Sequence, residues 1–187
     1  MRPASATTTL ARHWIPERSF LSDLGLVVGF SLFTGLMAHV AIPLPFTPVP
    51  ITGQTFAVLL CGALLGARLG TATMLLYITE GMIGLPVFAV APANAATYGY
   101  LAGFVAAAFV VGWFADMGWT RDLPRTVIAM VAGEAAIYFF GLLWLAHFVP
   151  ESKVLDFGLY PFLIGDAFKL AAAAIVVPAG WRLSRSR

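Results

Sequence analysis

The chain has 187 residues, of which 60% are hydrophobic and only 11% are charged, with a formal net charge of +2. Soluble domains carry roughly a quarter charged residues, so this composition excludes an ordinary soluble domain and indicates an integral membrane protein in the lipid bilayer. The length fits one helical bundle without a separate soluble domain, and nothing in the charge balance points to a nucleic-acid partner.

Six apolar segments predict an all-α fold, that of a polytopic membrane protein with six transmembrane helices. The transmembrane domain is expected over residues 21–183, after an N-terminal arm at 1–20 and before a tail at 184–187. The second and third segments fall short of the ~20 residues that cross a ~30 Å hydrocarbon core, so one long helix through 54–84 is an alternative. The six spans are expected near 21–42, 54–67, 70–84, 99–118, 124–148 and 159–181.

The distribution of arginine predicts the orientation of these spans. Arginines precede span one, separate spans two and three, separate spans four and five, and follow span six. They are Arg2, Arg12, Arg18, Arg68, Arg121, Arg125, Arg182, Arg185 and Arg187. Cytoplasmic connections carry an excess of Lys and Arg, so both termini are expected in the cytoplasm.

Two connections on the outer side, which follow spans one and three, are irregular. Residues 42–55 contain four prolines, which prevent helix and favour an extended backbone, yet the segment is apolar. Residues 84–100 are also apolar and are broken by Pro and Gly. Lipid cannot satisfy irregular backbone, so both loops are expected to reach membrane depth, packed against protein, and to line or cap a cavity. Gln54 and Asn94 lie in these loops, where polar groups often contact ligands.

Asp166 and Lys169 stand three residues apart in the apolar sixth span, where this spacing places them on one helix face. Ionisable groups inside a membrane are costly and usually face a protein interior or a cavity. In the predicted topology the pair lies at the level of the irregular loops, which predicts an outward-facing pocket. Asp accepts and Lys donates hydrogen bonds, which suits a ring with N–H and C=O groups, or an acid tail. An internal ion pair that only neutralises itself is the alternative.

Small residues recur along span one. Gly25 and Gly29, and then Ser31 and Gly35, are spaced so that a second helix can approach closely. The pattern predicts a helix-packing face, either inside the bundle or toward a partner.

Other residues have plainer interpretations, and an enzyme is the competing function. Glu80 fits an interfacial carboxylate, and Glu134 fits either helix packing or function. The tyrosines fit aromatic belts, as do Trp113, Trp119, Trp144 and Trp181. An intramembrane enzyme would combine these carboxylates with a histidine, but Glu134 and His147 are about 20 Å apart along one helix.

The single cysteine, Cys61, has no metal-ligand spacing around it, so no metal is expected. Neither Lys is followed by Ser or Thr, so the chain has no P-loop for ATP hydrolysis, and the HExxH and GxSxG motifs are missing as well. The chain is therefore not expected to be an enzyme.

Five motifs occur in a characteristic order. They are PLPFTPVPITGQT at 43–55, GALLG at 62–66, GLPVF at 84–88, GYLAGF at 99–104 and GDxxK at 165–169. Their order and intervals resemble the BioY family, the biotin-binding membrane subunits (S components) of energy-coupling factor (ECF) transporters. The resemblance covers about residues 20–183.

The resemblance implies a six-helix protein of the bacterial or archaeal cytoplasmic membrane that binds biotin from outside. It also implies a transmembrane coupling protein and two ABC-type ATPases as partners, which supply the ATP hydrolysis. Asp166 would accept hydrogen bonds from the ureido N–H groups of biotin, and Lys169 would donate to a ligand oxygen or orient Asp166. Helix one, with its small-residue face, is implied as the docking surface for the coupling protein.

The second irregular loop departs from the family pattern. The familiar Gly-Pro-Thr-Gly-Gly-Tyr is replaced by AATYGY at 95–100, and no Arg lies in this loop to hold a carboxylate. Asn94, Thr97, Tyr98 or backbone N–H groups are therefore the candidates that hold the acid tail. The resemblance implies biotin as the ligand, and no cofactor is expected. The expected ligand-binding residues are Asp166, Lys169, Asn94, Tyr98, Gln54 and Phe88.

Overall fold

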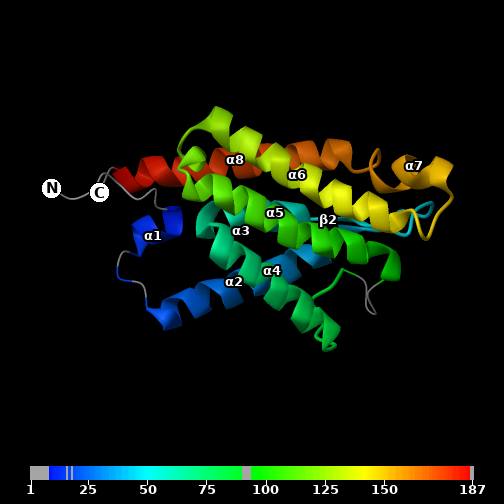
Figure 1. The fold of residues 1–187 in the computed structure, drawn as a ribbon, viewed down its shortest axis with the longest axis horizontal. Helices are drawn as coiled ribbons and strands as arrows, with labels where there is room; N and C mark the ends of the chain where they lie inside the picture. The colour runs from blue at the N-terminus through cyan, green and yellow to red at the C-terminus, as the bar shows by residue number, and fades with distance from the viewer. Residues whose placement is uncertain (1–8, 16, 18, 90–93, 186–187) are drawn as a thin grey trace.

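The apolar segments of the sequence form long helices that pack side by side (Figure 1). The computed structural model describes residues 9–15, 17, 19–89 and 94–185. The long helices are α2 (Phe20–His39), α3 (Gln54–Leu65), α4 (Ala67–Met82), α5 (Tyr98–Asp116), α6 (Leu123–Leu145) and α8 (Leu163–Arg185). The short elements are α1 (Leu10–Trp14), β1 (Ala41–Ile42), β2 (Ile51–Thr52), η1 (Ala95–Thr97), η2 (Trp119–Arg121), η3 (Glu151–Lys153) and α7 (Val154–Gly158). The end of α8 lies near α1, at what we call the terminal end, and α7 lies at the opposite end, the α7 end (Figure 1).

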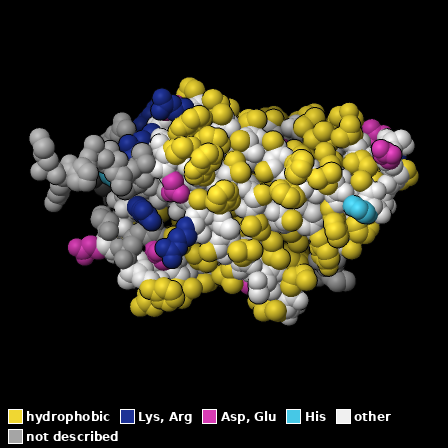
Figure 2. Space-filling view, viewed as in Figure 1, with side chains coloured by type: hydrophobic (Ala, Val, Ile, Leu, Met, Phe, Trp, Pro, Cys, Tyr) yellow, Lys and Arg dark blue, Asp and Glu magenta, His cyan; other side chains and the backbone are white. Residues whose placement is uncertain are grey.

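Four helices, α2, α5, α6 and α8, are long and apolar enough to cross a membrane, among the residues that the structure describes. α3 has 12 residues and α4 has 16. At ~1.5 Å per residue both are shorter than a ~30 Å hydrocarbon core. Helices therefore occupy all six predicted positions, while six complete crossings remain a prediction. Apolar side chains cover much of the surface between the two ends, as expected of a membrane protein (Figure 2).

A sharp break separates α3 from α4, so the alternative of one long helix through 54–84 is wrong. Gly66 has φ 85° and ψ 176°, a backbone conformation that is essentially restricted to glycine. The backbone N–H of Ala67 donates to Asp116 Oδ2 at 3.0 Å, which ties the start of α4 to the end of α5. The GALLG motif thus ends in a turn that requires its last glycine.

The proline-rich segment after α2 is extended, as its four prolines predict. Its ends pair as a small antiparallel hairpin, with Ala41 opposite Thr52 and Ile42 opposite Ile51. Val49, in the loop between the strands, is buried in the larger hydrophobic core. The first irregular loop is therefore packed against protein.

Hydrogen bonds connect the two irregular loops and α7 at the α7 end. Asn94 Nδ2 in the second loop donates to the Pro48 carbonyl in the first loop at 3.0 Å. Thr47 Oγ1 in the first loop donates to the Phe157 carbonyl in α7 at 2.8 Å. We call this assembly the loop cap, and it comprises α7 and residues 42–52, 84–89 and 94–97.

Glycine allows α5 and α6 to pack closely, which brings α6 next to the loop cap. A Cβ at Gly103 would lie 2.8 Å from Ile137 Cα, and a Cβ at Gly99 would lie 2.2 Å from Trp144 Cβ. Both distances are too short for real side chains. The glycines of the GYLAGF motif therefore set the distance between these two helices.

The predicted N-terminal arm contains α1, which folds onto the bundle. Leu10 is 6% exposed and packs in the same core cluster as Trp181 of α8. The rings of His13 and Trp181 have centroids 5.3 Å apart, and the Arg121 guanidinium lies 4.9 Å from the Trp181 ring centroid. The prediction of an aromatic-belt position is therefore wrong for Trp181, because α1 covers it.

Candidate ligand-binding site

A cavity lies between the loop cap and helices α3, α5, α6 and α8. Its space, counted together with its opening, is about 720 Å³. Most of the lining side chains are apolar or aromatic, and five of the six predicted ligand residues are among them. The lining residues are Val49, Pro50, Thr52, Gln54, Thr55, Phe88, Ala89, Asn94, Thr97, Tyr100, Leu101, Phe104, Ile137, Tyr138, Phe162, Asp166 and Lys169.

Asp166 and Lys169 form an ion pair on the wall of this cavity. Lys169 Nζ lies 2.8 Å from Asp166 Oδ1, and the two side chains are 18% and 8% exposed, respectively. They lie one turn apart near the start of α8, next to the loop cap. A buried ion pair is stable only when further hydrogen bonds satisfy its remaining donors and acceptors.

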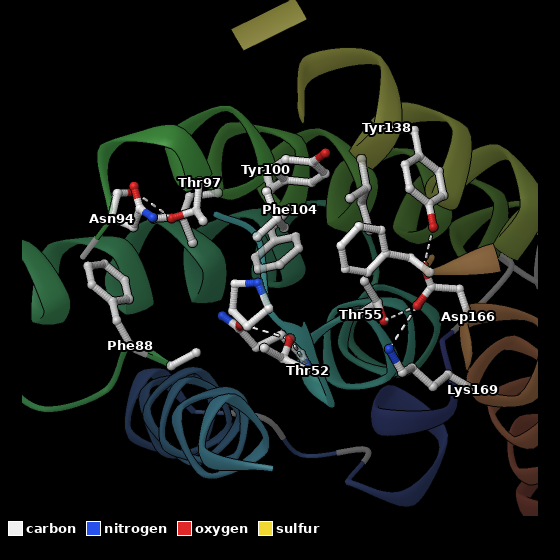
Figure 3. Close-up of a pocket in the computed structure, with 17 residues that line it drawn as sticks. Thr52, Thr55, Phe88, Asn94, Thr97, Tyr100, Phe104, Tyr138, Asp166 and Lys169 are labelled. Carbon is white, nitrogen blue, oxygen red and sulfur yellow. Dashed lines mark hydrogen bonds and ion pairs between the residues drawn. The ribbon is translucent and has the colours of Figure 1, made fainter. Parts of the chain in front are cut away.

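Three donors from three helices hold the Asp166 carboxylate (Figure 3). Thr55 Oγ1 on α3 donates to Oδ1 at 3.1 Å, and the Tyr138 hydroxyl on α6 donates to Oδ2. Lys169 Nζ on α8 is the third donor, at 2.8 Å from Oδ1. A carboxylate offers about four acceptor positions, so one position remains for a ligand donor.

Tyr138 and Thr55 are site residues that the sequence pattern did not reveal. The aromatic-belt prediction is wrong for Tyr138, and also for Tyr77 and Tyr100, which are 0% and 8% exposed. These tyrosines face the bundle because each hydroxyl finds a partner there. Two signals were present in the sequence: Thr55 ends the proline-rich motif, and Tyr138 lies four residues after Glu134, on the same helix face.

Gln54 connects the start of α3 to the second irregular loop. Its Nε2 donates to the Tyr77 hydroxyl at 2.7 Å, and that hydroxyl donates to the Val87 carbonyl at 3.0 Å. Gln54 Oε1 accepts from Thr52 Oγ1 at 2.9 Å. These bonds engage both the nitrogen and the oxygen of the amide, so Gln54 lines the cavity and also positions the loop above it.

The two polar regions of the cavity lie on opposite sides of it. Figure 3 shows Asn94, Thr97 and Phe88 on the side away from the charged pair, with Tyr100 and Phe104 between the two groups. The two ends of the cavity are therefore polar, and the middle holds the rings of Tyr100 and Phe104 together with Thr52. Such a cavity suits an elongated organic ligand with a polar group at each end. The part of the chain that the structure describes contains no cluster of three or more potential metal ligands.

Tyr98 lies apart from the other predicted ligand residues. It is 36% exposed and lines a separate apolar hollow with Trp144 and His147. Among the candidates for holding an acid tail, Asn94 and Thr97 line the main cavity and Tyr98 does not.

The small residues of α2 fall into two groups. Gly25 and Gly29 are exposed, and among the described residues a Cβ at either would meet nothing within 4 Å. Ser31 and Gly35 are buried: the Ser31 hydroxyl donates to the Glu80 carboxylate of α4, and a Cβ at Gly35 would lie 3.2 Å from the second loop. Ser31 and Gly35 therefore pack inside the bundle, whereas Gly25 and Gly29 leave an open face.

Comparison with known proteins identifies the family. The sequence model of the BioY family matches residues 6–186. The chain belongs to the BioY family. It is 35% identical to the probable biotin transporter BioY of Pyrococcus horikoshii, over 82% of this chain and 93% of that protein. It is 36% identical to the biotin transporter BioY of Thermotoga maritima, over 78% of this chain and 89% of that protein. These BioY relatives are named as transporters and not as enzymes, so the competing prediction of an intramembrane enzyme has no support among them.

A solved structure has the same fold. The S-component for biotin from an ECF-type ABC transporter matches with a TM-score of 0.77 and 25% sequence identity, over 89% of this chain and 92% of that chain. The resemblance read from the five motifs is thus confirmed, and the helical bundle described above is that of a BioY S component.

Proposed function

We propose that this protein is the biotin-binding S component of an ECF-type vitamin uptake transporter, and that the cavity next to the loop cap is its biotin site. One observation carries the proposal: in a member of the BioY family, the Asp166–Lys169 pair stands at one end of a largely apolar cavity. A ligand that enters this cavity meets a fixed acceptor and a fixed donor side by side.

The chemistry of biotin fits the distribution of polar groups in the cavity. The ureido ring carries N–H groups and a C=O, so it binds at Asp166 and Lys169. Asp166 accepts an N–H at its open position, and Lys169 donates to the ring oxygen or orients Asp166. The apolar part of the ligand packs against the aromatic side chains, and the acid tail extends toward Asn94 and Thr97.

The cavity opens to the outside, and both termini lie in the cytoplasm. Basic side chains gather at the terminal end, opposite the loop cap, which supports this orientation by the positive-inside rule (Figure 2). The short helices α3 and α4 complete their crossings with irregular backbone, because the first loop leads into α3 and the second loop follows α4. Such backbone is tolerated at membrane depth only when protein packs around it, as it does in the loop cap.

The coupling protein docks on the open face of α2. Gly25 and Gly29 lie on this face, where an added Cβ would meet no described residue within 4 Å, so a partner helix can approach closely. The coupling protein joins this subunit to two ABC-type ATPases, which hydrolyse ATP. This division of labour agrees with the absence of a P-loop motif from the sequence.

Equilibrium binding of radiolabelled biotin to the detergent-purified protein tests the proposal. We expect saturable binding at one site per chain, with weak competition by lipoic acid, which has the same acid tail but no ureido ring. Failure to retain biotin would overturn the proposed function. Equal competition by lipoic acid would overturn the assignment of the ring to Asp166 and Lys169.

A further inference from the structure

Glu134 on α6 is a buried carboxylate without a hydrogen-bond partner. It is 7% exposed, and neither of its carboxylate oxygens is bonded within the described part of the chain. A buried polar group that is left unsatisfied is costly, and an apolar side chain would avoid this cost. Glu134 is also not one of the side chains that line the cavity. A role beyond packing and beyond direct ligand contact would explain its presence.

The register of α6 against α8 places Glu134 beside the charged pair. The hydrogen bond from Tyr138 to Asp166 joins the two helices, which run in opposite directions (Figure 1). Glu134 precedes Tyr138 by four residues, and Lys169 follows Asp166 by three. Both steps are about one turn, or ~5.4 Å, toward the terminal end. Glu134 and Lys169 thus lie at about the same level of the bundle.

The ion pair stands where a ligand ring would bridge Asp166 and Lys169. Lys169 Nζ and Asp166 Oδ1 lie 2.8 Å apart, and Asp166 keeps one open acceptor position. A ring that donates to Asp166 and accepts from Lys169 enters between these atoms and draws them apart. The Lys169 ammonium has three donors, and a buried cation needs a nearby acceptor. Glu134 offers two unbonded carboxylate oxygens at the level of that ammonium.

We propose that Glu134 is a positioning residue for biotin, which accepts the Lys169 ammonium when the ligand ring separates Lys169 from Asp166. The inference rests on the proposed function, because it assumes that the ring binds at the charged pair. It assigns the two carboxylates different tasks: Asp166 contacts the ligand, and Glu134 balances the charge of the displaced Lys169.

A double-mutant cycle on biotin affinity tests this role. The four proteins are the wild type, Glu134→Gln, Lys169→Met and the double variant. We expect Glu134→Gln to weaken binding about tenfold or more in the wild-type background, the effect of losing a hydrogen bond between charged groups. In the Lys169→Met background, Glu134→Gln should change biotin affinity by less than about twofold, because no ammonium remains for Glu134 to bind. Unchanged affinity of the single variant, or an equal loss in both backgrounds, would overturn the proposal.

Two further variants separate charge from packing. Glu134→Asp keeps the charge on a shorter side chain and should retain most of the biotin affinity that Glu134→Gln loses. If Glu134→Asp lost as much affinity as Glu134→Gln, a role for the charge would be overturned. Glu80→Gln is the matched control, since Glu80 is another carboxylate of a helix in the bundle but is bonded to Ser31 outside the cavity. It should leave affinity unchanged, and a loss as large as that of Glu134→Gln would overturn a specific role for Glu134. Binding by the wild type is measured first, and its absence would overturn the proposed function itself.

Discussion

Replacing Asp166 by Asn tests the charged pair with little change of shape. Asn keeps one acceptor oxygen, but it converts the other oxygen into a donor and removes the charge. The hydroxyls of Thr55 and Tyr138 can rotate to meet an amide, whereas the Lys169 ammonium has donors only. Lys169 therefore loses the carboxylate that lies 2.8 Å from it, and the ligand loses a charged acceptor.

The structure sets the size of the expected effect on binding and on stability. A hydrogen bond to a charged group contributes about 1.5–3 kcal/mol, so biotin binding should weaken roughly 10- to 150-fold. Breaking a fully buried ion pair costs roughly 3–5 kcal/mol of stability. The cost here should be smaller, because the Lys169 side chain is 18% exposed.

Calorimetric titration with biotin and thermal unfolding, measured on three variants, check this reasoning. Asp166→Asn and Lys169→Met should each weaken binding while the protein remains folded. The double variant Asp166→Leu/Lys169→Met removes both charges, so it should be stable yet bind poorly. If the pair only neutralises itself, this double variant would bind biotin with normal affinity, and that result would refute a ligand role for both residues.

Three further predictions concern neighbouring features. Tyr138→Phe removes one donor to Asp166 and should weaken biotin binding about tenfold with little change in thermal stability; an unchanged dissociation constant would contradict the role of Tyr138. Gly29→Leu should leave biotin binding intact but reduce co-purification with the coupling protein, and full assembly of this variant would place the docking face elsewhere. Gly35→Leu should instead lower thermal stability, because its side chain meets Val87. Gly66→Ala should destabilise the protein by about 1–3 kcal/mol in denaturant unfolding, because alanine is strained at this backbone conformation, and an unchanged midpoint would contradict that account.

The positions of the helices could be predicted from the sequence because each requires only a run of apolar residues. The irregular loops could be predicted as well, since the prolines of the first loop exclude helix whatever the surroundings. The pairing of Ala41 with Thr52 could not, because two-residue strands leave no periodic pattern. Nor could α1, whose single buried leucine, Leu10, packs against residues that are distant in the sequence.

The charged pair was visible in the sequence, but its surroundings were not. Asp166 and Lys169 stand out because charge is rare in an apolar helix. Tyr138 and Tyr77 do not stand out, since a tyrosine in a membrane helix can face either lipid or the bundle, and only the packing of neighbouring helices decides between them. The same ambiguity applies to the small residues of α2, where Gly29 is open and Ser31 is covered by α4.

An experimental structure of the protein with bound biotin tests the central claim most directly. We expect the ureido ring at Asp166, the Lys169 ammonium moved toward Glu134, and the acid tail near Asn94 and Thr97. Biotin bound outside this cavity, or with its ring at the Asn94 end, would show that Asp166 and Lys169 do not bind the ureido ring.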